Sequence, residues 1–373
     1  MPPSERSRYD RQIALTGFGP QAQQRLRDAS VLVVGAGGLG TPLALYLTAA
    51  GVGRIGLVDF DTVDLSNLHR QVLYTEADLG RPKVEVLASR LRGANPHVDL
   101  VAHDVALSAD NADTLVGAYD LVADGTDRFS TRYLVNDTSV RLGRPNVFAS
   151  VNQFSGQLSV FGLGNGPCYR CLFPDPPPPG LVPTCAEAGV LGVLPGMLGT
   201  MQATEAIKVL TGVGSPLAGT LLLVDGLDMT FRSVRVERDP ACPVCGDHAV
   251  RTPPLPLSPP TMSIPEITVK ELHALDAEDK RPLVVDVRQP EEYEIGNING
   301  ALIPLGELPD RLDELESHRN DEQIVVHCRS GGRSGRAVEF LQSQGFTNVV
   351  NLKGGILAWS AEVDPSVATD MPG

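Results

Sequence analysis

Residues 30–61 read SVLVVGAGGLGTPLALYLTAAGVGRIGLVDFD, and this stretch decides the fold class. A short apolar run leads into a glycine-rich turn, a helical pattern and a second apolar run that ends at Asp59. The glycines of the turn are Gly35, Gly37, Gly38 and Gly40. Bare glycines between a strand and a helix let the backbone approach a phosphate, and an acidic residue about 20 positions further on suits a ribose hydroxyl. The stretch therefore predicts a Rossmann-like nucleotide site, with a nicotinamide-dependent oxidoreductase as one open interpretation.

Apolar runs and helical patterns keep alternating up to residue 150, which is typical of βαβ units around a parallel sheet. Helices are predicted from Leu39, across residues 82–91 and across residues 129–142. After residue 152, the stretches GQLSVFGL, GTLLLVDG and TFRSVRVER instead favour antiparallel strands. We expect these strands to extend the same α/β sheet.

A proline-rich boundary separates this region from a second, smaller α/β unit. The stretch RTPPLPLSPPTMSIPE begins at residue 251 and contains too much proline for a helix or a central strand. Beyond it, PLVVDVR, QIVVHCRSGGRSGRAVEF and NVVNLKGG again alternate strands with helices. We therefore divide the chain into a first domain at 1–250, a linker at 251–264 and a second domain at 265–365, as its length of 373 residues allows.

The formal net charge of the chain is −14 at pH 7. Nucleic acids and anionic membranes bind basic faces, so this charge argues against both as the main partner. The N-terminal stretch MPPSERSRYDRQIALTG lacks the apolar segment of a secretory signal. The longest charge-free stretch, residues 188–204, contains a proline and is too short to cross a membrane. We expect a cytoplasmic protein, with a buried helix or a subunit interface at residues 188–204.

Cationic side chains and a carboxylate bear on the choice of nucleotide chemistry. Arg70 and Lys83 follow the second strand, and Asp127 follows a later one. Phosphoryl or nucleotidyl transfer develops negative charge on phosphate oxygens, which cations stabilise, and it needs Mg²⁺, which a carboxylate can bind. Hydride transfer needs neither the cations nor the carboxylate. Each of these residues alone would be interpreted as a solvated surface group. Together they favour ATP chemistry over nicotinamide chemistry.

The first domain resembles the MoeB/ThiF adenylyltransferases, the prokaryotic relatives of the ubiquitin-activating enzymes. The resemblance spans residues 8 to about 250 and rests on the motifs RYDRQI, GAGGLG, AGVG, DFDTVDLSNLHRQ, GRPKVE, DGTDR, PCYRCLFP, TCAEAGVLG and CPVC. It implies adenylation with ATP and Mg²⁺. It also implies a homodimer in which Arg11 of one subunit reaches the phosphates bound by the other.

The resemblance further implies which residues line the ATP site. Asp59 would hold the ribose, while Arg70 and Lys83 would hold the phosphates. Asp127 would bind Mg²⁺ or line the pocket for the attacking carboxylate. The other nucleotide-binding positions that the motifs imply are Asp61, Ser66, Asn67, Gln71 and Arg128. The family usually has asparagine at the last of these positions, so Arg128 is a departure from the family pattern, although an arginine there could still face ATP.

Six cysteines require an assignment, because structural disulfides are rare in the cytoplasm. Cys168 and Cys171 form one C-x-x-C pair, and Cys242 and Cys245 form another. Two such pairs supply four thiolates for a closed, tetrahedral Zn²⁺ site that would pin the end of the domain to its middle. A redox-active C-x-x-C is the competing interpretation.

The two remaining cysteines suggest sulfur chemistry. Cys185 in PTCAEAGV precedes an apolar helical run, whose N-terminus would favour the thiolate. The resemblance gives this position to the acyl-accepting or disulfide-forming cysteine of the family, and a bystander cysteine is the alternative. Cys328 lies in VVHCRSGGRSGR, where a strand, a glycine-bearing loop and a helix would form an anion-binding nest beside Arg329 and Arg333.

The loop that begins at Cys328 is one residue too short for a tyrosine phosphatase, which has five residues between its cysteine and arginine. The domain instead resembles a rhodanese over residues 265 to about 360. Its other landmarks are VVDVR with Asp286 and Arg288, EEYEIGNINGALIPL and LKGGILAW, with NING in place of the usual His-Ile-Pro-Gly. This resemblance implies a persulfide on Cys328. We expect no catalytic histidine, and we interpret Trp359 as a core residue.

Together the two resemblances imply one function. The first domain would adenylate the C-terminal glycine of a ubiquitin-like sulfur-carrier protein that ends in Gly-Gly, and the persulfide would convert it to a thiocarboxylate. The sulfur donor would be a cysteine desulfurase or thiosulfate. The carrier could serve molybdopterin, thiamine, thiolated tRNA or cysteine synthesis. An oxidoreductase with an accessory domain and a non-catalytic sulfur-relay scaffold are the alternatives.

Overall fold

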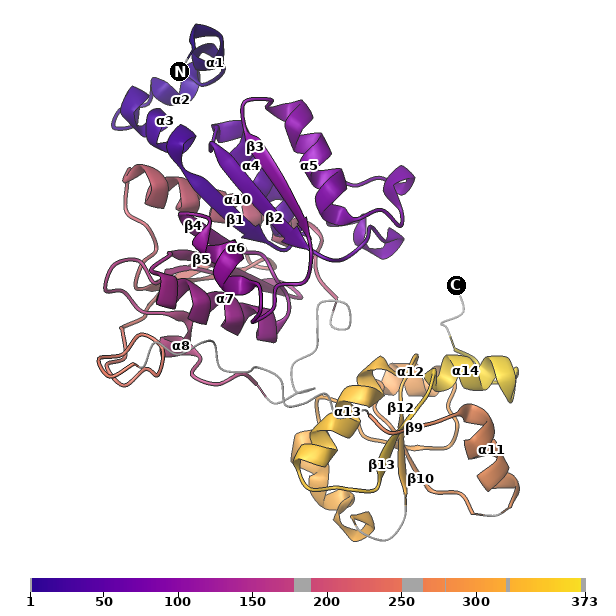
Figure 1. Ribbon diagram of the computed structural model, residues 1–373. Helices are drawn as coiled ribbons and strands as arrows, with labels where there is room; N and C mark the ends of the chain where they lie inside the picture. The colour runs from indigo at the N-terminus through magenta and orange to yellow at the C-terminus, as the bar shows by residue number, and fades with distance from the viewer. Residues whose placement is uncertain (1, 178–188, 250–263, 279, 320–322, 370–373) are drawn as a thin grey trace. The chain divides into compact units, whose positions relative to one another are not determined.

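The computed structural model describes residues 2–177, 189–249, 264–278, 280–319 and 323–369 (Figure 1). These residues form two compact units, one built on an eight-stranded sheet and the other on a five-stranded sheet. Cys185 and nearly all of the predicted linker lie outside the described residues, so the domain boundaries stay predictions. Within the described ranges, no helix combines the length and the apolar character that crossing a membrane requires.

The larger sheet is mixed, as the sequence predicts. Its strands are β1 (Ser30–Val34), β2 (Arg54–Asp59), β3 (Asp99–Asp104), β4 (Leu121–Asp124), β5 (Asn146–Asn152), β6 (Ser155–Phe161), β7 (Thr220–Asp225) and β8 (Thr230–Arg235). They lie in the order β3-β2-β1-β4-β5-β6-β7-β8. The strands from β3 to β5 in this order are parallel, and β6, β7 and β8 are added antiparallel. Because β2 and β4 flank β1, the carboxyl end of β1 is the switch point at which such sheets bind ligands.

Helices cover both faces of this sheet (Figure 1). They are α1 (Pro3–Arg8), α2 (Asp10–Ile13), α3 (Gly19–Asp28), α4 (Gly40–Ala50), η1 (Leu65–Asn67), η2 (Glu76–Asp78), α5 (Lys83–Ala94), α6 (Ala112–Gly117), α7 (Phe129–Leu142), α8 (Tyr169–Leu172) and α10 (Val193–Thr211). α4, α5 and α10 pack on one face, and α6 and α7 pack on the other. α7 has the predicted bounds, α4 and α5 each begin one residue later than predicted, and α10 includes most of the charge-free stretch.

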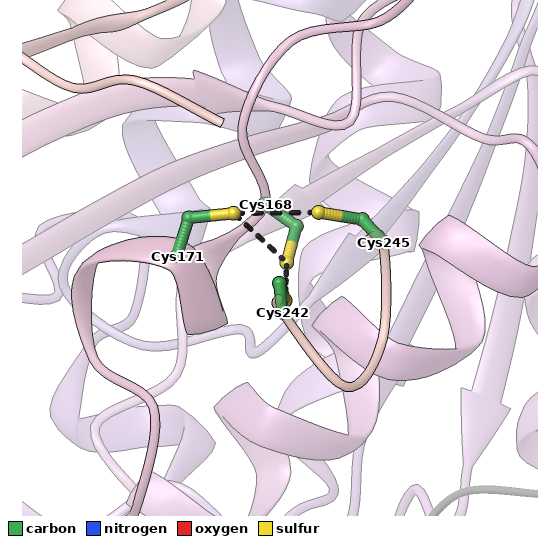
Figure 2. A group of neighbouring side chains, drawn as sticks. All are labelled: Cys168, Cys171, Cys242 and Cys245. Carbon is green, nitrogen blue, oxygen red and sulfur yellow. Dashed lines mark hydrogen bonds between the residues drawn. The ribbon is translucent and has the colours of Figure 1, made fainter. Parts of the chain in front are cut away.

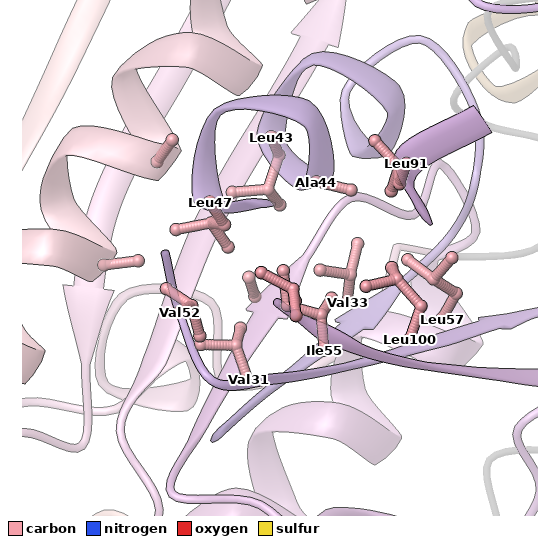
Figure 3. Close-up of a cluster of buried hydrophobic side chains, with 14 of the residues drawn as sticks. Val31, Val33, Leu43, Ala44, Leu47, Val52, Ile55, Leu57, Leu91 and Leu100 are labelled. Carbon is pink, nitrogen blue, oxygen red and sulfur yellow. The ribbon is translucent and has the colours of Figure 1, made fainter. Parts of the chain in front are cut away.

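Alternating side chains of the parallel strands supply the core on both faces. Val31 of β1 and Ile55 of β2 pack with Leu43 and Leu47 of α4, and all four side chains are fully buried (Figure 3). Leu32, the next residue along β1, packs with α6 and α7 instead. Strands that are buried on both faces carry continuous apolar runs. This packing holds the start of α4 rigidly at the end of β1.

The second unit is a smaller, wholly parallel sheet with helices on both faces. Its strands are β9 (Glu266–Ile267), β10 (Leu283–Asp286), β11 (Ala301–Leu302), β12 (Ile324–His327) and β13 (Val349–Leu352), in the order β11-β10-β12-β13-β9. Its helices are α11 (Val269–Ala277), α12 (Pro290–Ile295), η3 (Leu308–Glu314), η4 (Glu316–His318), α13 (Gly332–Ser343) and α14 (Gly355–Glu362). Trp359 of α14 is buried in this core, as predicted.

Candidate functional site

The glycine-rich turn joins β1 to α4 at the switch point of the large sheet. Gly35 has a φ of +96°, and a Cβ on Gly40 would lie 1.8 Å from the Gly35 carbonyl oxygen. Neither position therefore admits a side chain unless the backbone moves. A Cβ on Gly37 would meet nothing nearer among the described residues than the Gln71 amide nitrogen, at 3.7 Å. The turn closes through Gly35 and Gly40 and leaves the backbone at Gly37 open to a ligand.

Asp59 ends β2 beside this turn. Its Oδ2 accepts a hydrogen bond from the Ala36 N–H at 2.7 Å, and its Oδ1 accepts one from the Asp61 N–H at 2.9 Å. Burial raises the pKa of Asp59, and these two hydrogen bonds act against that shift. The carboxylate is thus tied to the turn in the position that Rossmann-like sheets use for ribose.

Lys83, the first residue of α5, is a buried cation on the same side of the turn. Its side chain is only 5% exposed, and its Nζ lies 3.1 Å from Oδ2 of Asp61, which is half exposed. Its charge also lowers the pKa of Asp59, although burial has the larger, opposite effect there. A buried ammonium with one partly solvated partner can exchange that partner for phosphate oxygens.

Arg70, Asn67 and Gln71 form a wall over the turn. The Asn67 Oδ1 accepts hydrogen bonds from Arg70 Nη2 at 3.0 Å and from Gln71 Nε2 at 2.9 Å. A Cβ on Gly38 would lie 3.5 Å from the Cγ of Arg70. The exposed Ser66 supports this wall through its backbone, because its carbonyl oxygen accepts a hydrogen bond from Arg70 Nη1 at 3.1 Å. The structure thus brings these predicted residues to the turn, while their roles stay predictions.

Asp127 and Arg128 lie on the opposite side of the turn, in the loop after β4. A Cβ on Gly125 would lie 3.2 Å from the amide nitrogen of Gly40, so this loop abuts the turn. Both side chains are exposed, and the Arg128 guanidinium carbon lies 4.8 Å from the centroid of the Phe60 ring. Because Phe60 follows β2, this cation–π contact joins the two loops that flank the end of β1.

Arg11 was predicted for the ATP site but lies away from the glycine turn of its own chain. Its neighbours in the chain contact the C-terminal end of α4: a Cβ on Gly51 would clash with the Tyr9 ring, and Gln12 Nε2 donates to the Ala50 carbonyl oxygen at 3.3 Å. α4 has 11 residues and is therefore about 16 Å long. Arg11 thus lies near the opposite end of α4 from the turn of its own chain.

The four paired cysteines come together, as predicted (Figure 2). All of their Sγ atoms lie within 4.8 Å of one another, with Cys168 and Cys242 at 3.6 Å and Cys171 and Cys245 at 3.3 Å. These separations exceed the about 2.05 Å of a disulfide bond. They are close to the edge of roughly 3.8 Å of a tetrahedron whose corners lie about 2.3 Å from Zn²⁺. The four thiols are therefore unpaired and fit the geometry of a structural zinc site.

A buried ion pair beside this cluster was missed by the sequence analysis. Arg170, between the first two cysteines, donates from Nε and Nη2 to Asp137 of α7 at 2.8 and 2.9 Å, and both side chains are buried. The Tyr169 N–H also donates to Asn136 Oδ1 at 2.7 Å. α8 is therefore anchored to α7. The available signal was the pair of polar residues Asn136 and Asp137 inside the apolar pattern of a helix.

Cys328 follows the central strand β12, and its loop leads into α13, as predicted. Its Sγ accepts hydrogen bonds from the Gly331 N–H at 3.2 Å and from the Ser334 hydroxyl at 3.3 Å. Ser334 is fully buried, and its Oγ also lies 2.7 Å from Asn351 Oδ1 on β13. Donors arranged around a sulfur in this way stabilise a thiolate or a persulfide anion.

Asp286, Arg288 and His327 form a buried polar group beside this loop. Arg288 donates from Nη2 to Asp286 Oδ2 at 2.6 Å, and His327 Nε2 lies 3.3 Å from the same oxygen. All three side chains are at most 2% exposed. Burial lowers the pKa of His327 to about 4, so the imidazole is neutral at pH 7. His327 is thus a neutral, fully buried side chain at the end of β12.

Two known family models match this chain, one for each of its two units. The model of the ThiF family matches residues 9–244, which is more than half of the chain. The chain belongs to the ThiF family. A model of the rhodanese-like domain matches residues 268–362, so this ThiF-family protein carries a C-terminal rhodanese-like domain. Both resemblances inferred from the sequence are confirmed.

Several curated relatives of this ThiF-family protein are similar over long alignments. It is 57% identical over 249 residues to the sulfur carrier protein adenylyltransferase of Thermus thermophilus, an alignment that covers 65% of this chain and 92% of the relative. It is 40% identical over 382 residues to the probable adenylyltransferase/sulfurtransferase MoeZ of Mycobacterium tuberculosis. This alignment covers 97% of this chain and 95% of the relative. It is 41% identical over 383 residues to the adenylyltransferase and sulfurtransferase MOCS3-1 of Zea mays. This alignment covers 96% of this chain and 82% of the relative.

Solved structures resemble this protein in fold. A crystal structure of E. coli MccB has a TM-score of 0.59 at 23% identity, over 64% of this chain and 75% of that one. A crystal structure of PaaA has a TM-score of 0.55 at 22% identity, over 64% and 76%. At these identities the likeness concerns the fold alone.

Proposed function

We propose that this ThiF-family protein is an ATP-dependent adenylyltransferase and a sulfurtransferase in one chain, and that it acts on a ubiquitin-like sulfur-carrier protein. The proposal rests on one observation: the chain combines a glycine turn lined by Arg70 and Lys83 with a thiol, Cys328, that is surrounded by hydrogen-bond donors. Relatives aligned over nearly the whole chain carry both activities in their names. An oxidoreductase would use the turn but would need neither the cations nor Cys328.

In the adenylation step, the C-terminal carboxylate of the carrier attacks the α-phosphorus of ATP, and pyrophosphate leaves. The open backbone at Gly37 accommodates phosphate, while Arg70 and Lys83 neutralise the charge that develops on its oxygens. Asp59 holds the ribose. Asp127 is the candidate ligand for the Mg²⁺ that accompanies ATP, and its exposed side chain fits an ion that keeps most of its water and binds one or two carboxylates.

In the sulfur step, the outer sulfur of a Cys328 persulfide attacks the carbonyl carbon of the acyl-adenylate. AMP leaves with the electron pair of the broken C–O bond, and an acyl disulfide forms. A second thiolate then attacks the Cys328 sulfur, so the carrier leaves as a thiocarboxylate and a disulfide remains for a cellular dithiol to reduce. Cys185 is the candidate for this second thiolate, and an external thiol is the alternative. The Gly331 N–H and the Ser334 hydroxyl stabilise the anionic sulfur.

The cluster of four cysteines would hold Zn²⁺ as a structural ion. All four positions of the tetrahedron are filled by protein thiolates, which leaves no open position for a substrate. The ion would join the segment after β8 to α8, which the ion pair between Arg170 and Asp137 anchors to α7. Its contribution is therefore to stability and not to the chemistry.

A second copy of the chain would complete the ATP site. Arg11 lies near the opposite end of α4 from its own glycine turn, which favours a role at the turn of a neighbouring subunit. We therefore propose a homodimer in the cytoplasm. The sulfur donor would be a cysteine desulfurase persulfide or thiosulfate.

The decisive experiment incubates each Gly-Gly-ended carrier of the same cell with this protein, MgATP and a sulfur donor, and then measures the intact mass of the carrier. A gain of about 16 Da, one oxygen exchanged for sulfur, supports both steps. Cys328→Ala should abolish the gain and retain carrier-dependent ATP–pyrophosphate exchange. Asp127→Ala should abolish the exchange and retain sulfur loading of Cys328. No exchange with any carrier would favour the non-catalytic scaffold.

A further inference from the structure

The first turn of α13, directly after the Cys328 loop, contains a cation whose partner lies in another helix. Arg333 donates from Nη1 and Nη2 to the two carboxylate oxygens of Glu292 in α12, each at 2.6 Å. The side chains are 20% and 30% exposed, so solvent and a small anion can reach the pair. Arginine offers the same two-pronged face to sulfonates and phosphates. Glu292 therefore occupies the face of Arg333 that an anionic ligand would use.

Arg333 lies close enough to Cys328 for their charges to interact. The hydrogen bond with Glu292 is the main cause of the raised pKa of Arg333, and the negative charge of Cys328 raises it further. The same hydrogen bond lowers the pKa of Glu292, which keeps this carboxylate ionised at neutral pH. The pair is thus closed under the conditions in which Cys328 would accept sulfur.

Two contacts hold α12 without using the charge of Glu292. Arg288 Nη1 donates to the Glu292 carbonyl oxygen at 3.2 Å, and the Tyr293 hydroxyl donates to the Gly300 carbonyl oxygen at 3.0 Å. Glu292 Oε2 also accepts a hydrogen bond from the Gln289 N–H at 3.0 Å, and a glutamine oxygen can still accept this bond, although more weakly than a carboxylate does. Replacing the carboxylate by an amide should therefore leave the helix in place.

We propose that Glu292 is a specificity-determining residue, which competes with anionic sulfur donors for Arg333 and so favours singly charged persulfides over dianionic thiosulfate. This inference rests on the sulfurtransferase function proposed for Cys328. The sulfonate end of thiosulfate must displace Glu292 from Arg333 or lie next to its negative charge. The reacting end of a persulfide carries one charge and has no sulfonate that requires the guanidinium.

Both donors deliver sulfur by the same exchange. The Cys328 thiolate attacks the outer sulfur of thiosulfate, a new S–S bond forms, and the old S–S bond breaks with its electron pair on the departing sulfite. With a persulfide, attack on the outer sulfur releases the thiolate of the donor in the same way. The leaving groups differ in charge, because sulfite leaves as a dianion. Glu292 therefore disfavours thiosulfate by occupying the cation that both its binding and its leaving group would use.

The test compares Glu292→Gln with the unaltered full-length protein, using thiosulfate and cysteine persulfide as the two donors. Sulfur loading of Cys328 is followed by mass spectrometry of its peptide. Sulfite release gives KM and kcat for thiosulfate, and the initial rate of loading against donor concentration gives KM for cysteine persulfide. We expect Glu292→Gln to lower KM for thiosulfate roughly five- to tenfold, since a like charge is removed beside the anion. The KM for cysteine persulfide should change little. Glu291→Gln removes the same charge from an exposed position of α12 and is the matched control.

The effect must also require Arg333. In an Arg333→Gln background, the Glu292 substitution should leave KM for thiosulfate unchanged. A rise in KM for Glu292→Gln would overturn the proposal and make Glu292 a residue that positions Arg333 for the donor. An equal fall in Glu291→Gln, or without Arg333, would reduce the effect to net charge and overturn it as well.

Failure of the underlying function would look different. If the unaltered protein loads Cys328 from neither donor, the proposed sulfurtransferase activity fails, whatever the substitutions do. Trp359, the single tryptophan of the chain, lies in the core of this unit and reports by its fluorescence whether each variant is folded. Glu292→Ala serves as a second variant with the same expected fall in KM, should the glutamine variant not fold.

Discussion

At the scale of single residues, the Ser334 hydroxyl serves two acceptors. Its Oγ lies 3.3 Å from the Cys328 sulfur and 2.7 Å from Asn351 Oδ1. A hydroxyl carries one hydrogen, so it can donate to only one of these atoms at a time. We expect it to face Asn351 while Cys328 is a thiol and to turn to the sulfur when the sulfur is charged.

We predict that Ser334→Ala slows alkylation of Cys328 at neutral pH by about tenfold, because a hydrogen bond to a charged acceptor contributes roughly 1.5 kcal/mol or more. The measurement is the rate of iodoacetamide labelling of the Cys328 peptide in the full-length protein. Ser330→Ala, at an exposed position of the same loop, is the control and should label at the original rate. Unchanged labelling of Ser334→Ala would mean that backbone donors such as the Gly331 N–H suffice.

At the scale of elements, the turn between β1 and α4 uses two glycines in different ways. Gly40 has no space for a side chain, since a Cβ would lie 1.8 Å from the Gly35 carbonyl oxygen. Gly37 has space, and its backbone faces the region where we place the phosphates. One glycine thus permits the packing of the turn, and the other keeps the ligand space open.

We predict opposite behaviour for alanine at these two positions. Gly40→Ala should lower the free energy of unfolding by on the order of 3 kcal/mol or more, because the backbone must move. Gly37→Ala should retain the original unfolding temperature and lose the stabilisation that ATP gives the protein. Thermal unfolding with and without MgATP measures both. If Gly37→Ala is stabilised by ATP as before, the phosphates do not lie at this turn.

The central strand of the second unit ends in a buried histidine, His327. Its burial makes the stability of this unit sensitive to acid. Burial lowers the pKa of His327 in the folded protein to about 4, below the ordinary histidine value of 6.5. Between these pH values the unfolded chain binds a proton and the folded chain does not. Stability therefore falls as the pH decreases from 6.5 to 4, by about 3 kcal/mol from this residue.

We predict that His327→Gln loses this part of the pH dependence. Trp359 fluorescence during denaturant unfolding of the full-length protein follows the second unit alone, because the chain has no other tryptophan. The unaltered protein should lose more stability between pH 6.5 and pH 4 than His327→Gln does. Equal losses in the two proteins would assign the acid sensitivity to carboxylates such as Asp286.

At the scale of the whole molecule, the position of Arg11 makes subunit exchange informative. We predict that Arg11→Ala and Lys83→Ala are each defective in ATP–pyrophosphate exchange. After mixing and reassociation, mixed dimers should contain one intact site, which restores about a quarter of the original activity if pairing is random. No recovery on mixing would mean that Arg11 acts within its own subunit, and a fully active Arg11→Ala variant would mean that Arg11 has no role in the exchange. Sedimentation of the mixture verifies that dimers form.

Metal removal should affect the stability of the first unit. We predict about one zinc ion per chain by elemental analysis, in line with the four-thiolate cluster. Cys245→Ser should abolish binding of the ion and lower the free energy of unfolding by several kcal/mol, because the segment after β8 loses its link to α8. Cys328→Ser should leave the zinc content unchanged. A stable, metal-free protein would contradict the assignment.

Local sequence patterns were enough to predict the elements and the chemical types of the sites. The bounds of α7, the strands of the large sheet, the glycine turn, the two C-x-x-C pairs and the Cys328 loop all follow from local patterns. They do so because side-chain period, the missing Cβ of glycine and the spacing of cysteines act over a few residues. The side chains expected around Asp59 could be predicted for the same reason, since they follow the ends of neighbouring strands.

The pairing of distant charges could be seen only once the chain was folded. Arg170 pairs with Asp137 across 33 positions of the chain, and Arg333 pairs with Glu292 across 41. The contact of Arg128 with Phe60, and the distance of Arg11 from its own turn, likewise depend on how strands and helices pack. A charged side chain carries no local sign of its partner, because its attraction acts through space and only the packed core brings the two groups within reach.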